Sequence, residues 1–133
     1  MNIIACIDNE NGILFNSRRQ SRDAHIFDDI KNTIDSKIIY CSEYSAKLLQ
    51  EYSLSPAVVK TLKAVPENGY YFLENTLPPD LLPEIKKVII YKWNKSYPKD
   101  TYLGMDFSNL KLVHTSDFQG KSHKLITKEI YEL

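Results

Sequence analysis

No excess of charge of either sign is present in this sequence. Its 133 residues carry 17 lysines and arginines against 17 aspartates and glutamates, so the formal net charge is zero. A neutral chain has no general electric field that would draw it to nucleic acid or to anionic lipid. We therefore do not expect nucleic acid as a partner, and any anion-binding site must come from a local cluster of basic side chains.

The sequence also lacks long apolar runs. Its apolar stretches are far shorter than the roughly 20 residues that a membrane-spanning helix needs. The chain starts directly with the strand-like "NIIACID", without the basic segment and cleavage site of a secretory leader. These absences predict a soluble, cytoplasmic protein without a membrane partner.

Cysteine and histidine are scarce, which bears on metal binding. The two cysteines, Cys6 and Cys41, each lie inside an apolar run, where a thiol is typically a buried core residue. The three histidines, His25, His114 and His123, share no spacing that is typical of metal ligands. The sequence therefore predicts no metal site, and we expect His114 and His123 on the surface of the last two strands.

The first two thirds of the chain show an alternation of predicted strands and helices. Apolar runs predict buried strands over residues 2–8, 37–41, 70–75 and 87–93. Apolar residues at helical spacing predict one helix from an N-cap at Asp23 to Ile34, and a second helix after an N-cap at Ser42. Residues 53–68 indicate a loop and a weak helix, and residues 77–85 a short helix opened by prolines.

The last third of the chain has a different pattern. The segments "TYLGM", "NLKLVHTSDF" and "HKLITKEIYEL" alternate apolar and polar residues, as antiparallel strands with one solvated face do, and "QGKS" connects the last two. No internal repeat or linker divides the chain. The sequence therefore predicts a single α/β domain over residues 1–133, with a mixed, mostly parallel sheet, flanking helices and an antiparallel C-terminal hairpin.

The order of these elements and several short motifs resemble the dihydrofolate reductase fold family. "NIIACIDNENGILFN" is similar to the family's first strand and its loop into the substrate site. The segment that begins with "LPPDLLPEI" and ends with "LVHTSDF" is similar to the family's last helix and the strands that follow it. Together these blocks cover somewhat more than half of the chain. Aligned from the loop, Asp23 matches the family's acidic substrate-binding residue, whereas a count back from Lys37 places Ile26 there. Thr101 matches the threonine that hydrogen-bonds that carboxylate.

Three departures from the family concern its cofactor. An acidic turn over residues 41–44 replaces the family's phosphate-binding Gly-Arg-(His/Lys)-Thr run, and Glu74 and Asn75 replace its paired glycines. The segment before "YYFLEN" is too short for the two strands that flank the adenosine. The resemblance therefore implies a shortened fold with cofactor-side strands reduced or absent, no NADPH cofactor and no ordinary dihydrofolate reductase activity. Short sequences labelled ribonuclease Z also look similar, but that enzyme's His-x-His-x-Asp-His zinc cluster is missing here.

Three arginines gather in "RRQSRD", between the first strand and the first helix. One interpretation is a solvated loop whose arginines pair with Asp23, Asp28 or Asp29. Another is an anion site, because guanidinium groups bind carboxylate or phosphate bidentately and a helix N-terminus favours anions. Our hypothesis is that a small pocket for an anionic ligand is rimmed by Arg18, Arg19 and Arg22 and completed by Asp23 and Thr101.

This hypothesis predicts a protein that binds a small anionic molecule, pterin-like or nucleotide-like, with Asp23 as the candidate catalytic residue if a reaction takes place. One alternative is an NADPH-dependent reductase of the dihydrofolate reductase type. The other is a non-enzymatic module whose arginines dock an acidic partner surface. A pocket should turn at least one guanidinium inward over the cleft, whereas a docking patch leaves all three pointing outward.

Overall fold

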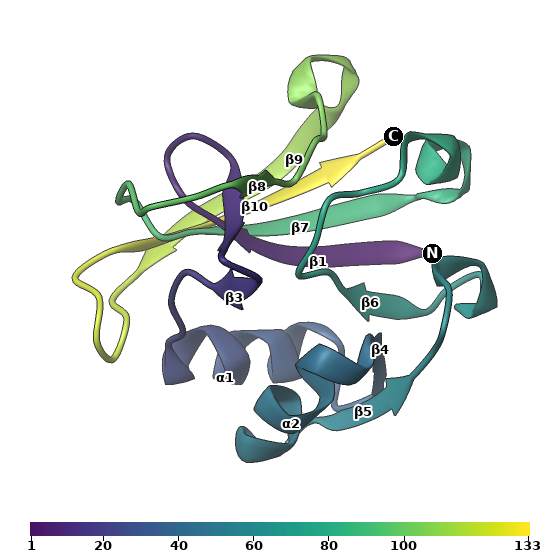
Figure 1. The fold of residues 1–133 in the computed structure, drawn as a ribbon, viewed down its shortest axis with the longest axis horizontal. Helices are drawn as coiled ribbons and strands as arrows, with labels where there is room; N and C mark the ends of the chain where they lie inside the picture. Colours follow the sequence, from purple (N-terminus) through teal and green to yellow (C-terminus); the bar gives the residue numbers. More distant parts are fainter.

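Seven strands form one mixed sheet in the order β5-β4-β6-β1-β7-β10-β9 (Figure 1). The structure is a computed structural model and describes all residues from 1 to 133. The strands are β1 (Asn2–Ile7), β4 (Ile38–Cys41), β5 (Ser55–Val58), β6 (Tyr70–Phe72), β7 (Lys87–Lys92), β9 (Lys111–Phe118) and β10 (Ile126–Glu132). The first five strands in the spatial order run parallel, and β10 pairs antiparallel with both β7 and β9. The predicted parallel core and antiparallel C-terminal hairpin are therefore confirmed, and β1 lies inside the sheet.

A second, small sheet lies at one end of the first and has the order β3-β2-β8. Its strands are β2 (Gly12–Phe15), β3 (Arg18–Arg19) and β8 (Thr101–Tyr102). The segment "TYLGM" was expected to be a full strand, but only its first two residues pair, and they pair with β2. This small sheet holds the arginine segment against the end of β1.

Both faces of the parallel part of the large sheet are covered, whereas the outer strand β9 has no buried residue. Helices α1 (Ala24–Thr33) and α2 (Glu43–Glu51) lie on one face, where Ile26, Ile30 and Leu49 pack on Ile4 and Ile39 (Figure 1). The other face is covered by β2 and by the 3-10 helix η2 (Pro79–Glu84) with its flanking loops. Neither α1 nor α2 has the length and apolar character that a membrane span requires.

The ends of the helices follow the sequence signals. Asp23 is the N-cap of α1, and its carboxylate accepts a hydrogen bond from the His25 N–H, as predicted. Ser42 occupies the N-cap position of α2, although its side chain makes no capping hydrogen bond. The connection between β9 and β10 contains the predicted "QGKS".

The segment 53–68 is where the sequence interpretation was wrong. It contains strand β5, which pairs in parallel with β4, and the short 3-10 helix η1 (Leu62–Ala64). β5 is an edge strand with no fully buried residue, so it lacks the apolar run that marks the inner strands. Its Pro56 also lowers the strand signal, although an edge strand tolerates proline.

Candidate functional site

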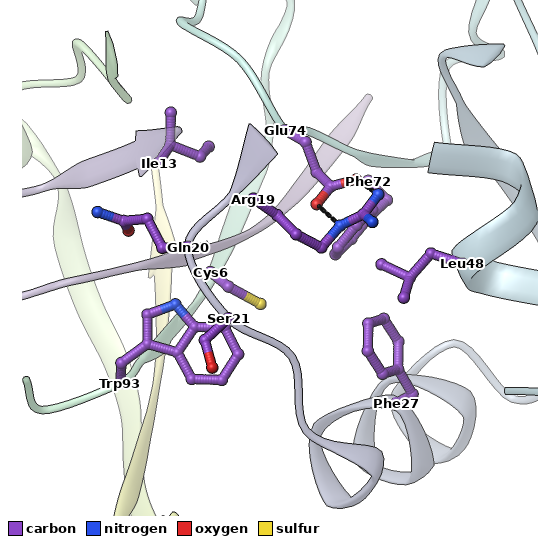
Figure 2. Close-up of a pocket in the computed structure, with 10 residues that line it drawn as sticks. All are labelled: Cys6, Ile13, Arg19, Gln20, Ser21, Phe27, Leu48, Phe72, Glu74 and Trp93. Atoms are coloured by element: carbon purple, nitrogen blue, oxygen red, sulfur yellow. Dashed lines mark hydrogen bonds and ion pairs between the residues drawn. The ribbon is translucent and has the colours of Figure 1, made fainter. Parts of the chain in front are cut away.

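A small cavity lies at the carboxyl ends of β1, β6 and β7, the usual ligand-binding edge of a parallel sheet. It is lined by Cys6, Ile13, Arg19, Gln20, Ser21, Phe27, Leu48, Phe72, Glu74 and Trp93. Figure 2 shows these side chains arranged around one space, with the segment 19–21 crossing over it. The volume open to the centre of a water molecule is about 10 Å³, so this inner cavity holds roughly one water as it stands.

Arg19 points into the inner cavity and forms a bidentate ion pair there. Its Nε and Nη2 donate to the two Glu74 carboxylate oxygens at 2.8 and 2.9 Å, and Ser45 Oγ donates to Glu74 Oε1 at 2.7 Å. The guanidinium also lies 4.5 Å from the centre of the Tyr44 ring. Burial alone lowers the pKa of Arg19, but the hydrogen bonds and charge of Glu74 outweigh it, so the pKa is raised. Arg19 is therefore the one arginine of the cluster that turns inward.

Gln20 is held in place by the buried carboxylate of Asp8, at the end of β1. Asp8 accepts from Gln20 Nε2 at 3.0 Å, from the Gly12 N–H at 2.8 Å and from the Tyr97 N–H at 3.1 Å, and it pairs with Lys99. Burial raises the pKa of Asp8, but these donors outweigh burial and lower it. With Gln20 Nε2 engaged, Gln20 Oε1 is buried without a hydrogen-bond partner. The wall of the inner cavity thus carries an unused acceptor.

An open groove lies on the outer side of the same segment. It has a volume of about 500 Å³ and is lined by Phe15, Asn16, Arg18, Arg19, Gln20, Tyr97 and Pro98. Arg18 is exposed along it, and no acidic residue is among its lining side chains. The outer groove shares Arg19 and Gln20 with the inner cavity, so these two side chains form the partition between the two spaces.

The other residues of the predicted pocket do not converge on it. Arg22 lies on the surface, where it pairs with Glu51 at 2.9 Å. Thr101 Oγ1 donates to the neighbouring Asp100 at 3.0 Å and does not contact Asp23. Neither Arg22 nor Thr101 lines the inner cavity or the outer groove. The partners expected for a solvated loop, Asp23, Asp28 and Asp29, do not pair with the arginines either.

Asp23 is buried and fully engaged by the hairpin between β9 and β10. Its carboxylate accepts from the N–H groups of Lys121 and Ser122, both at 2.9 Å, and contacts His123 Nδ1 at 2.8 Å. Burial raises the pKa of Asp23, but these hydrogen bonds outweigh burial and hold it well below its ordinary value. A ligand would have to displace protein donors to reach this carboxylate.

His123 corrects the sequence-based expectation of a surface position. Its side chain is only 5% exposed, and its ring packs on Trp93 with centroids 4.8 Å apart. It lies in the hairpin connection, where sequence spacing gives no sign that it meets a residue 100 positions earlier. His114, by contrast, is exposed on β9 as expected.

The two cysteines are both free. Cys41 is buried in the helix-covered core, and burial raises its pKa to about 11. Cys6 lines the inner cavity, and burial together with the charge of Glu74 raises its pKa far above the ordinary value. No group of three or more His, Cys, Asp or Glu side chains is placed to hold a metal ion.

Comparison with known proteins adds no relative to this description. No protein-family model matches the chain, and no curated protein matches it with significant similarity. Function is therefore inferred from the geometry of the inner cavity, the outer groove and the partition between them.

Proposed function

We propose that this chain binds a small anionic molecule that extends from the inner cavity into the outer groove. The observation that carries the proposal is the arrangement of Arg19. This residue borders both spaces, and its guanidinium is turned inward at the carboxyl ends of the parallel strands. A patch built only for docking a partner would leave all three guanidiniums pointing outward, so the ligand-binding alternative is favoured.

The chemistry of the two spaces defines the ligand class. The inner cavity is lined by the aromatic side chains of Phe27, Phe72 and Trp93 and by Gln20 with its unused acceptor Oε1, which suits a flat ring with a polar N–H edge. The outer groove offers Arg18, with no acidic neighbour in its lining, to a carboxylate or phosphate. Because the inner cavity now holds about one water, binding requires Arg19 to leave Glu74 and change rotamer, as interface side chains commonly do, while Asp8 keeps Gln20 in place.

We further propose that the fold is a shortened form of the dihydrofolate reductase fold. The interior position of β1, the parallel core and the C-terminal hairpin support it. A groove beside the N-terminus of α2 is lined by Ser42, Tyr44, Glu74 and neighbouring residues, without any lysine or arginine. Since phosphate contacts supply much of a dinucleotide's affinity, we expect no NADPH cofactor. A calorimetric titration should show no binding of NADPH at micromolar concentration.

A thermal-shift screen tests the binding proposal. Pterins, folates, nucleotides and sugar phosphates at millimolar concentration should include at least one compound that raises the Tm of the native protein by several degrees, because a ligand at about 100 times its Kd adds about 2.7 kcal/mol of stability. If no compound does so, the proposal is wrong.

Arg18→Ala and Arg22→Ala form a matched pair for the same screen. Both arginines are exposed, and each variant removes one positive charge. Arg18 lines the outer groove, so its removal should weaken the ligand-induced shift. Arg22 lines neither space and should leave the shift unchanged. Equal responses of the two variants would contradict the assignment of the anionic group to the outer groove.

A further inference from the structure

A serine that lines the inner cavity is linked by close contacts to a histidine and, through it, to an aspartate. Ser21 Oγ lies 2.9 Å from His123 Nε2, and His123 Nδ1 lies 2.8 Å from Asp23 Oδ2. Ser21 lines the inner cavity, where its side chain is drawn beside the Trp93 ring (Figure 2). We propose that Ser21 is a nucleophile with His123 as its general base and Asp23 as the residue that positions the base, and that this site hydrolyses small esters.

The hydrogen bonds select the tautomer that the reaction needs. A carboxylate at Nδ1 places the imidazole proton on Nδ1, which leaves the Nε2 lone pair facing Ser21 Oγ. Ser21 Oγ has no other partner in the protein, so its proton is directed at that lone pair. The Tyr97 hydroxyl also approaches Nε2, but at 3.2 Å, and Tyr97 lines the outer groove instead of the inner cavity.

The surroundings hold His123 in one orientation. Its ring packs on Trp93, and Ser122 Oγ lies 3.2 Å from both His123 Nδ1 and Asp23 Oδ2. Asp23 is fixed by backbone N–H groups from two segments of the chain, the start of α1 and the hairpin connection. A base oriented by a buried carboxylate that is itself immobile is the arrangement that activates a serine hydroxyl.

A donor for the developing oxyanion is present at the same residue. The backbone N–H of Ser21, which lines the inner cavity, donates no hydrogen bond to the protein. The N–H of a nucleophilic serine is among the donors that stabilise tetrahedral intermediates in acyl transfer. In the proposed site it binds the carbonyl oxygen of the ester.

The reaction balances with water as the only co-substrate. Ser21 Oγ attacks the ester carbonyl carbon while its proton passes to His123 Nε2. The ester C–O bond then breaks, and His123 returns the proton to the departing alkoxide, which leaves as an alcohol. Water, deprotonated by His123, attacks the acyl-serine. The acyl–Oγ bond then breaks, His123 returns the proton to Ser21 Oγ, and the carboxylic acid leaves. The small inner cavity favours short acyl groups such as acetyl.

This proposal does not depend on the anionic ligand proposed above. A fluorophosphonate reacts with an activated serine and needs no other ligand. A bond forms between the serine Oγ and phosphorus as the P–F bond breaks and fluoride leaves. Mass spectrometry of the treated native protein should locate the adduct on Ser21. Ser21→Ala should abolish it, and the exposed Ser55→Ala on β5 should label as the native protein does. An unmodified Ser21 in the folded native protein would overturn the proposal, whatever the ligand screen gives.

Two variants test the roles of the partners. His123→Asn keeps a donor for Asp23 but removes the base, and Asp23→Asn removes the carboxylate that sets the tautomer. In folded protein, checked by circular dichroism, each should slow Ser21 labelling by about 100-fold or more. Labelling of folded His123→Asn at the native rate would show that His123 only supports the hairpin.

Hydrolysis of 4-nitrophenyl acetate supplies an independent readout. The native protein and Ser55→Ala should release 4-nitrophenol faster than Ser21→Ala by at least about tenfold after subtraction of the buffer rate. Ser21 is half-buried and its side chain makes one hydrogen bond, so the Ser21→Ala variant should fold. Equal rates for native protein and Ser21→Ala would overturn the esterase assignment.

Discussion

Asp8 and Asp23 are the two buried carboxylates of this chain, and each joins segments that are distant in sequence. Asp8 connects the end of β1 to the loop that carries Tyr97 and Lys99. Asp23 connects the start of α1 to the hairpin connection at Lys121 and Ser122. Each carboxylate has its lone pairs filled by protein donors, so each stabilises the loop geometry around the inner cavity more than a surface ion pair would.

Asp8→Asn should lower the free energy of unfolding by about 3 kcal/mol, because an amide presents N–H groups to the Tyr97 N–H and the Lys99 ammonium. Urea denaturation followed by circular dichroism measures the loss. Asp28→Asn, at an exposed position of α1, should change stability by less than about 0.5 kcal/mol. A similar small change for Asp8→Asn would show that the buried carboxylate adds little to stability.

At the scale of elements, the connection between β9 and β10 packs closely against the start of α1. A Cβ on Gly120 would lie 2.6 Å from Asp23 Oδ2 and 2.8 Å from the His123 carbonyl oxygen. Only glycine therefore allows the Lys121 and Ser122 N–H groups to reach the carboxylate. The segment "QGKS" was predicted as the hairpin connection, and its glycine is also needed for this close approach of the backbone to Asp23.

Gly120→Ala should destabilise the protein by about 2 kcal/mol, because the hairpin must shift away from Asp23. Differential scanning calorimetry would record the change as a lower Tm. The neighbouring Gln119→Ala provides the control, since the Gln119 side chain is exposed and makes no hydrogen bond. If the two variants melt at the same temperature, the close packing of the hairpin on Asp23 is not required.

Two neighbouring isoleucines of strand β4 provide a second pair of variants at the scale of elements. Ile39 is fully buried beneath the helices, whereas its neighbour Ile38 is 51% exposed. Ile39→Ala should cost about 3 kcal/mol through lost burial and a cavity, and Ile38→Ala less than about 1 kcal/mol. Chemical denaturation of both variants checks the register of β4, and the reverse order would mean that the strand faces the other way.

The order of elements could be predicted from sequence because the inner strands and both helices carry strong periodic patterns. Asp23 was recognised as an N-cap, since capping is a local signal. Three features could not be read: β5, whose residues are only partly buried; the burial of His123; and the pairing of Arg19 with Glu74. The last two depend on contacts between distant segments, for which one sequence contains no periodic sign.

At the scale of the whole molecule, acid should unfold this protein through its two buried carboxylates. The folded pKa values of Asp8 and Asp23 both lie below the ordinary value of 3.8. The unfolded chain therefore takes up protons first as the pH falls, and the stability that both groups contribute above about pH 4 is lost below it. Each carboxylate steepens the decline by at most about 1.4 kcal/mol per pH unit.

Urea denaturation at intervals between pH 6 and about pH 2 measures this decline. Asp8→Asn should reduce the slope below pH 4, because one of the two depressed groups is gone. Asp28→Asn should reproduce the native slope. A native stability that stays constant down to pH 2 would contradict the depressed pKa values.

The raised pKa values of the two free thiols make their alkylation rates a measure of how the molecule opens. Cys41 lies in the helix-covered core and Cys6 at the inner cavity, and the raised pKa of each keeps the unreactive protonated form at neutral pH. Alkylation of the buried Cys41 must therefore wait until the surrounding structure separates, and its rate reports the population of open states. Alkylation of the half-buried Cys6 requires only that the reagent enter the inner cavity. Because Cys6 lies on β1 and Cys41 on β4, the two modification rates compare access to the inner cavity with opening of the sheet around β4, the neighbour of the edge strand β5.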